Sequence, residues 1–205
     1  VAYLVDLDSA QIADDKWYYP SNVGIPEFRS PEHIYDDDFS FRRKKADDVW
    51  IMQMLIFHML TPDGDPYAGS RDFDDERDII AKGYYPYQAG NIGAEEQIKG
   101  SIWHMIVSHF PKFLKELFWN SFHGNGKYFH EETRRSSLDW LRTIVRYQEA
   151  LPGIVKVNPE SGKYLPESYP KQIQSKGNVK INAGDSDMEL EDILEQLKNF
   201  NQGWV

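Results

Sequence analysis

Residues 46–60 read ADDVWIMQMLIFHML, and they are almost wholly apolar after the two aspartates. An apolar run of this length predicts an α-helix that is hydrophobic all round, and such a helix is expected at the centre of a fold. Asp47 or Asp48 suits its first turn, where the helix dipole favours acidic groups. The stretch that follows, TPDGDP at residues 61–66, ends the helix because its prolines and glycine cannot continue it. The sequence therefore predicts a buried central helix.

Further helices are predicted downstream from the spacing of apolar residues, and they span residues 74–82, 95–109, 111–122 and 138–151. Gly83 is expected to close the first of them as a C-cap. Ser136 and Ser137 can cap the last, which the pair Pro152-Gly153 is expected to end. Residues 123–126, HGNG, read as a turn.

The chain ahead of the central helix contributes little regular structure. Residues 1–5, VAYLV, predict one short strand, and residues 13–31 read as a long ordered loop. The fold class expected from the whole pattern is mainly α, with a short β element at the N-terminus.

Three parts follow along the chain: a folded domain at residues 1–151, a polar linker or tail at 152–185, and a final helix at 186–200. The last helix is acidic and amphipathic, and its apolar stripe needs a surface to pack on, either in this domain or in a partner. The stripe consists of Leu190, Ile193, Leu194 and Leu197.

Composition narrows the classes of function. The 205 residues are 40% hydrophobic and 14% aromatic, which is typical of a folded domain. A net charge of −10 opposes binding to a nucleic acid or a membrane surface, although the local run Arg42 to Lys45 can bind an anion or simply flank a helix. No cysteine is present, so disulfides, thiolate catalysis and Cys-ligated zinc are excluded. No membrane-length apolar run or signal peptide is found, and a cytoplasmic protein is expected.

Four motifs then occur in order, and together they resemble the C-terminal lobe of eukaryotic-type protein kinases. In that family they correspond to the DFG segment, the end of the activation segment, the start of the central helix and the opening of a late helix. The four motifs are LVDLDSAQI at residues 4–12, GIPEFRSPE at 24–32, ADDVW at 46–50 and RRSSLDW at 134–140. They look most like a divergent bacterial branch of Ser/Thr kinases or pseudokinases in which DLDS stands in place of DFG, and they cover residues 1–151.

The resemblance assigns a metal role to the first motif. Asp6 falls on the DFG aspartate, which holds the magnesium ion that bridges the ATP phosphates, and Asp8 can add a second oxygen. The alternative is that Asp6 is only a turn residue that ends a strand.

The resemblance also places an activation segment at residues 6–32, and Gly24, Ile25, Pro26 and Phe28 are then expected to shape the groove for a protein substrate. Glu32 and Arg134 are expected to form a buried ion pair that ties this segment to the late helix, because the planar guanidinium suits a carboxylate.

Two residues of the central helix complete the set that the resemblance implies. Asp48 resembles the acid that hydrogen-bonds the backbone of the catalytic loop, and simple capping of the helix is its other interpretation. Trp50 is expected to be structural.

The function implied is that of a kinase lobe whose parent binds Mg-ATP and transfers the γ-phosphoryl group to a protein hydroxyl. The Gly-rich loop, the strand lysine and the His-Arg-Asp loop do not occur in the 205 residues, so the isolated chain is expected to be inactive. Two departures, Ile25 in place of Thr and Asp8 in place of Gly, favour an impaired pseudokinase that acts as a protein-interaction module. A second alternative is a haloacid-dehalogenase-type phosphatase, in which Asp6 is a nucleophile and strands alternate with helices.

Overall fold

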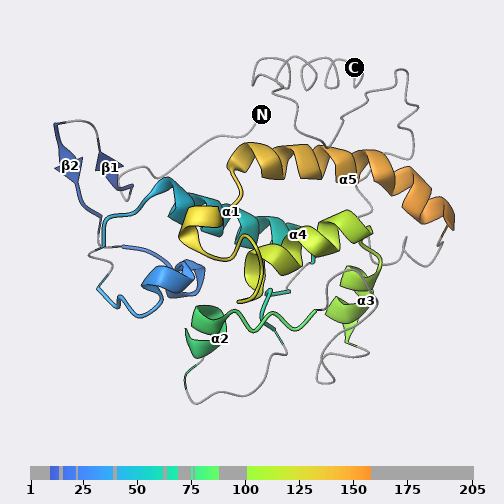
Figure 1. Ribbon diagram of the computed structural model, residues 1–205, viewed down its shortest axis with the longest axis horizontal. Coiled ribbons are helices and arrows are strands. Elements are labelled where there is room, and N and C mark those ends of the chain that lie inside the picture. Colours follow the sequence, from blue (N-terminus) through green and yellow to red (C-terminus); the bar gives the residue numbers. More distant parts are fainter. Residues whose placement is uncertain are drawn as a thin grey trace.

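The structure is a computed structural model, and it describes residues 10–13, 16–21, 23–38, 41–61, 64–68, 75, 77–87 and 101–157. These residues are mainly helical, as the sequence predicted (Figure 1). Three single-turn 3₁₀ helices at Pro26–Phe28, Pro31–His33 and Glu131–Thr133 accompany the longer elements. The helices are α1 (Lys45–Leu60), α2 (Arg77–Lys82), α3 (Ile102–Ser108), α4 (Lys112–Phe122) and α5 (Ser137–Val157), and the strands are β1 (Ile12–Ala13) and β2 (Tyr18–Tyr19).

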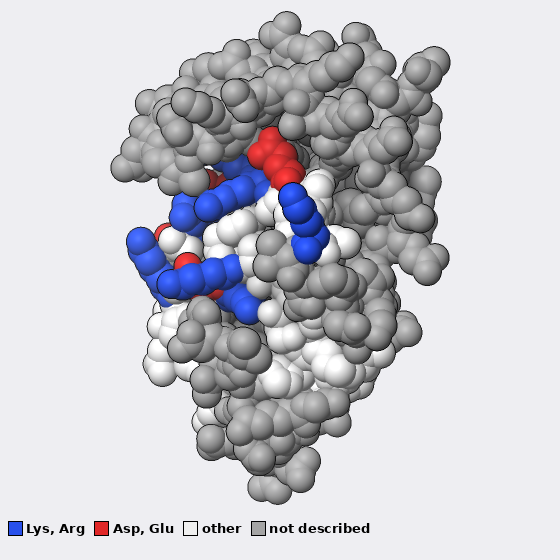
Figure 2. All heavy atoms as spheres, turned by 90° about the vertical axis from the view of Figure 1, so that its right-hand side faces the viewer, with Lys and Arg blue, Asp and Glu red and all other residues white. Residues whose placement is uncertain are grey.

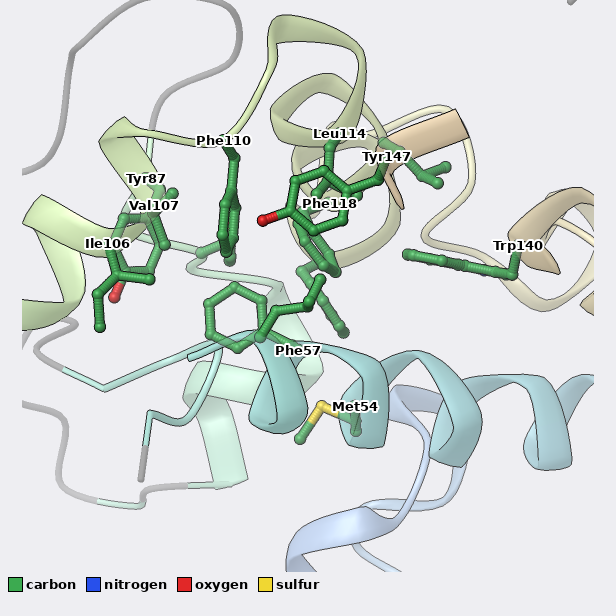
Figure 3. Packing of buried hydrophobic residues seen from close by; sticks show 14 of the residues in the cluster. Met54, Phe57, Tyr87, Ile106, Val107, Phe110, Leu114, Phe118, Trp140 and Tyr147 are labelled. Carbon is green, nitrogen blue, oxygen red and sulfur yellow. The ribbon is translucent and has the colours of Figure 1, made fainter. Parts of the chain in front are cut away.

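Helix α1 begins one residue before the predicted 46–60 and ends at the predicted residue. Its buried face packs against α4 and α5 through large rings (Figure 3). Phe57 lies edge-on to Phe118, with ring centroids 5.0 Å apart, and Trp140 of α5 lies 5.6 Å from Phe118 on its other side. Such offset ring pairs add stabilisation beyond the apolar area that they bury.

The prediction that α1 is buried on all sides is wrong. Leu55 and Met59 are 46% and 67% exposed, although both belong to the apolar run. They lie four residues apart and so share one face of the helix. The described elements pack on the opposite side, which carries Trp50, Met54 and Phe57, so this apolar face is left uncovered.

Helix α5 begins one residue before the predicted residue 138 and ends later than predicted. Ser136 caps it, because its Oγ accepts the Asp139 N–H at 3.2 Å while the Asp139 carboxylate accepts the Ser136 N–H at 3.2 Å. The helix then continues through Pro152 to Val157, so the predicted end at Pro152-Gly153 is wrong. Pro152 is exposed near the end of a long helix, where a proline removes one backbone donor without disturbing a packed neighbour.

The predicted C-cap at Gly83 is confirmed. Its φ is 63°, in the left-handed region that favours glycine, and its carbonyl accepts the Gly124 N–H at 2.9 Å. A Cβ atom at Gly83 would lie 2.3 Å from the Gly124 nitrogen, so the turn after α4 and the end of α2 can approach this closely only without a side chain.

The segment predicted to be a loop at residues 13–31 contains part of a small hairpin. Strands β1 and β2 pair antiparallel, with Ile12 opposite Tyr19 and Ala13 opposite Tyr18. The strand expected at residues 1–5, most of the linker expected at 152–185 and the final helix expected at 186–200 lie outside the described residues. Within the described part of the chain, none of the helices has both the length and the apolar character needed to cross a bilayer.

A pair of substitutions in α1 tests which face of this helix is packed. Phe57→Ala is expected to lower the free energy of unfolding by roughly 3–5 kcal/mol, because it removes a fully buried ring from the aromatic core. Met59→Ala, two residues away and 67% exposed, is the matched control and is expected to change it by less than about 0.5 kcal/mol. Urea denaturation monitored by circular dichroism measures both. Equal losses would contradict the packing described here.

Candidate functional site

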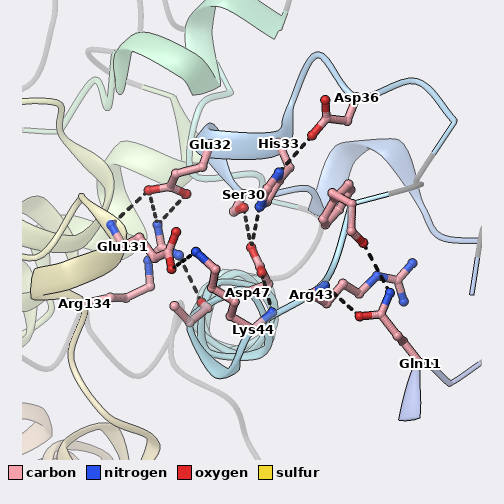
Figure 4. Close-up of polar contacts among 12 residues, drawn as sticks. Gln11, Ser30, Glu32, His33, Asp36, Arg43, Lys44, Asp47, Glu131 and Arg134 are labelled. Atoms are coloured by element: carbon pink, nitrogen blue, oxygen red, sulfur yellow. Dashed lines mark hydrogen bonds and ion pairs between the residues drawn. The ribbon is translucent and has the colours of Figure 1, made fainter. Parts of the chain in front are cut away.

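The motif at residues 24–32 lies against the N-terminal end of α1 (Figure 4). It folds as the two 3₁₀ turns Pro26–Phe28 and Pro31–His33, each with proline at its first position. Proline suits that position because its fixed φ matches the turn and its missing N–H would have no partner there. The sequence thus shapes this loop locally before any tertiary contact holds it.

Glu32 and Arg134, 102 residues apart in the sequence, form the ion pair that the motifs predicted. The Nη2 atom of Arg134 donates to both carboxylate oxygens of Glu32, each at 2.9 Å. The Arg134 side chain is 1% exposed and that of Glu32 is 25% exposed. The Glu131 backbone N–H also donates to Glu32 at 2.9 Å, so the carboxylate is held from two directions.

The remaining contacts of Arg134 were not predicted. Its Nη1 donates to the Ala46 carbonyl at 3.0 Å, and Nη2 donates to the Phe129 carbonyl at 3.0 Å. The guanidinium also lies 5.2 Å from the ring centroid of Trp50, within the range of a cation–π contact. A single nitrogen, Nη2, serves both carboxylate oxygens, so the pair is not a two-nitrogen fork. The guanidinium instead joins the loop, the first turn of α1 and the segment before α5.

A second carboxylate fastens the same loop to α1. Asp47 is 6% exposed. Its carboxylate accepts hydrogen bonds from the Ser30 hydroxyl at 2.6 Å and from the Lys44 backbone N–H at 2.8 Å. The capping role considered for Asp48 therefore belongs to Asp47. Asp48 is exposed, and desolvation followed by the neighbouring charge of Asp47 raises the pKa of its carboxyl.

His33, Asp36 and Arg29, which the sequence did not single out, complete this region together with Lys44 of the basic run at residues 42–45. His33 stacks on Phe41 with ring centroids 3.9 Å apart, and its Nδ1 lies 2.8 Å from an oxygen of Asp36. The guanidinium of buried Arg29 donates to the Asp36 carbonyl at 2.8 Å. Lys44 pairs with Glu131 at 2.7 Å, which raises the pKa of the lysine through the hydrogen bond and the nearby negative charge.

The residues expected to shape a substrate groove lie together at the start of this loop. Gly24, Ile25 and Pro26 are exposed, and Ile25 is 60% exposed. Phe28 is partly buried against the core and lies edge-on to His58, with ring centroids 5.8 Å apart. The loop is therefore fixed from Phe28 onward, while Ile25 and Pro26 present their side chains to solvent.

The predicted metal ligands Asp6 and Asp8 lie outside the described residues. Among the residues that are described, no three His, Asp or Glu side chains come together in a way that could hold a metal ion. The assignment of magnesium and ATP therefore rests on the sequence motif at residues 4–12.

Comparison with known proteins adds no relative. No family model matches the chain, and neither a curated protein nor a solved structure matches it significantly.

The ion pair is tested by removing its exposed partner. Glu32→Ala is expected to lower the free energy of unfolding by roughly 3 kcal/mol, since it leaves the buried Arg134 without its compensating charge. Glu27→Ala removes an exposed carboxylate from the preceding 3₁₀ turn and is expected to cost less than about 0.5 kcal/mol. Chemical denaturation at pH 7 compares the two, and a Glu32→Ala variant as stable as Glu27→Ala would refute the buried pairing.

Neighbouring aspartates supply a second matched pair. Asp47→Asn is expected to cost roughly 1–3 kcal/mol, because two hydrogen bonds to a buried carboxylate are weakened. Asp48→Asn is expected to leave stability unchanged or slightly higher at pH 7. A carboxyl whose pKa is raised in the folded state is destabilising once it ionises, and the amide removes that charge. Thermal unfolding at pH 7 measures the stability of both variants. A larger loss for Asp48→Asn than for Asp47→Asn would mean that Asp48 caps the helix.

Proposed function

We propose that the chain is the C-terminal lobe of a Ser/Thr protein kinase-like protein. The parent binds Mg-ATP and transfers the γ-phosphoryl group to a hydroxyl of a protein substrate. The 205 residues alone do not carry out the transfer, because the nucleotide loop, the strand lysine and the catalytic aspartate loop do not occur in them.

One observation carries the proposal. The Glu32 carboxylate of the Pro-Glu motif pairs with the buried Arg134, which precedes the Ser-Ser cap of α5. The motifs alone predict this pair, although the two residues lie 102 positions apart in the sequence. The predicted partners meet, and the Arg134 side chain is 1% exposed, so the contact supports the resemblance on which the function rests.

The surrounding geometry is consistent with a loop that presents a protein substrate. Ser30 contacts Asp47 and Glu32 contacts Arg134, and these two contacts hold the loop against the domain. Residues Gly24 to Pro26 remain exposed at the surface. A fixed loop with an exposed rim can bind an extended peptide without paying much ordering entropy. The exposed apolar side chain of Ile25 would then contact the substrate residue next to the acceptor hydroxyl.

An alternative is a catalytically impaired pseudokinase that binds a partner protein. The 60% exposure of Ile25 favours it, because a solvent-exposed isoleucine at the position of a hydrogen-bonding threonine suits a binding surface better than a catalytic one. The phosphatase alternative has lost support. It requires strands that alternate with helices, and the described chain from residue 101 to 157 forms only helices and turns.

The proposal is tested on the parent protein that contains this chain. With radiolabelled ATP, magnesium and a mixed Ser/Thr peptide library, the parent is expected to transfer label, and Asp6→Asn is expected to reduce the rate by at least about a hundredfold. Asp14→Asn, in the same segment, is the control and is expected to retain activity.

Two outcomes would decide between the alternatives. Transfer that survives Asp6→Asn would remove the metal role of Asp6 and with it the equivalence of residues 4–12 to the DFG segment. A parent that neither transfers label nor gains thermal stability with Mg-ATP would overturn the catalytic proposal in favour of the interaction module.

A further inference from the structure

The outward face of α5 carries a stripe of cations on a protein that is strongly acidic overall. Arg142, Arg146 and Lys156 are spaced so that they share one side of the helix, with Glu149 between them. Figure 2 shows the face of the molecule on the side of α3 and the end of α5, where Lys and Arg side chains gather and few acidic ones accompany them. A basic face of this kind is unusual where the net charge is −10.

Helix α4 extends this face. The Arg146 guanidinium lies 4.1 Å from the ring centroid of Phe113, so the stripe on α5 contacts the first turns of α4, which also carry Lys112 and Lys115. Lys112 is 72% exposed in its side chain and lies 3.5 Å from Glu116, while Lys115 donates to the Ser108 carbonyl at 2.9 Å. The basic face is defined as Lys112, Lys115, Arg142, Arg146 and Lys156.

Two of these cations lack a counter-charge. In the part of the chain that the structure describes, no carboxylate lies within ion-pair distance of Arg146 or Lys156, and both residues are exposed. Glu149 is the acid on the same stripe, and partial desolvation raises the pKa of its carboxyl. The face therefore has positive potential available for a negatively charged partner.

The same chain contains such a partner in its sequence. Residues 185–195, DSDMELEDILE, hold six carboxylates and no Lys, Arg or His. The described structure ends at Val157, immediately after Lys156, so the polypeptide leaves the described domain at this face. Residues 158–185 would span roughly 90 Å if fully extended, more than the length of α5, so they do not prevent residues 185–195 from returning to it.

We propose that the acidic segment at residues 185–195 docks on the basic face of α4 and α5 in the same molecule. Its carboxylates pair with Arg146, Lys156 and Lys112, while its apolar residues Leu190, Ile193 and Leu194 turn toward the helix surface between them. Attachment to the same chain raises the effective concentration of the segment, so individually weak surface ion pairs are sufficient. This interaction does not depend on the phosphotransferase activity.

The test uses the full chain, whose lack of cysteine allows labels to be placed at two chosen positions. Spin labels are attached to Gly153→Cys, where nothing lies within 4 Å of an added Cβ atom, and to Asn199→Cys. Electron–electron double resonance at low salt is expected to give one narrow distance population. At 1 M salt, where the screening length falls to about 3 Å, this population is expected to broaden.

Charge reversals of equal size locate the docking face. Arg146→Glu with Lys156→Glu is expected to abolish the narrow population. Arg42→Glu with Lys45→Glu makes the same change of net charge near β2 and α1, and it is expected to leave the distance unchanged. Far-UV circular dichroism checks that both variants keep their helices.

Three results would overturn the proposal. They are a broad distribution in the unsubstituted background, a narrow one that is lost on substitution of Arg42 and Lys45 instead, and a short distance between two singly labelled chains. The last result would mean that the basic face binds the acidic segment of a second copy of the chain.

Discussion

The buried guanidinium of Arg134 constrains the arrangement of everything around it. A charge that is 1% exposed is tolerated only where carboxylates and carbonyls surround it, and here Glu32, Ala46 and Phe129 supply those acceptors from three separate segments. Each acceptor fixes the position of its own segment relative to the others. The Arg134 side chain therefore joins the loop at residues 24–38, the first turn of α1 and the approach to α5, and its guanidinium packs against the ring of Trp50.

The aromatic core explains why that side chain is held so firmly. Trp50 is fully buried, and its ring meets Phe122 and Phe129 edge-on at 5.6 and 6.1 Å. Helix α1 thus joins the apolar interior to the polar cluster at its own N-terminus. The loop rests on a rigid base, while its first residues, including Ile25, remain at the surface. This division between a fixed base and an exposed rim is the feature that a peptide-binding loop requires.

The sequence predicted those parts of the structure that local chemistry determines. The bounds of α1 follow from a long apolar run, the cap at Ser136 from a capping box, and Gly83 from the need for a positive φ. It did not distinguish Asp47 from Asp48, because neighbouring helical residues point about 100° apart and the rotation of α1 is set by tertiary packing. The hydrogen bonds from Arg134 to two backbone carbonyls could not be predicted from the sequence either, because every residue has a carbonyl and the sequence does not indicate which ones are near. The helix that continues past Pro152 shows that a proline near an exposed end is a weak stop signal.

Hydrogen exchange of the Glu131 backbone amide is the most direct test of the ion pair between Glu32 and Arg134. This N–H donates to the Glu32 carboxylate at 2.9 Å and lies in a 3₁₀ turn near the protein surface, where the turn itself offers it no partner. If the ion pair holds the loop in solution, the Glu131 amide exchanges only when the domain unfolds, and its protection is comparable to that of the amides of α1. Exchange at the rate of an unprotected loop amide, with α1 still protected, would contradict the account.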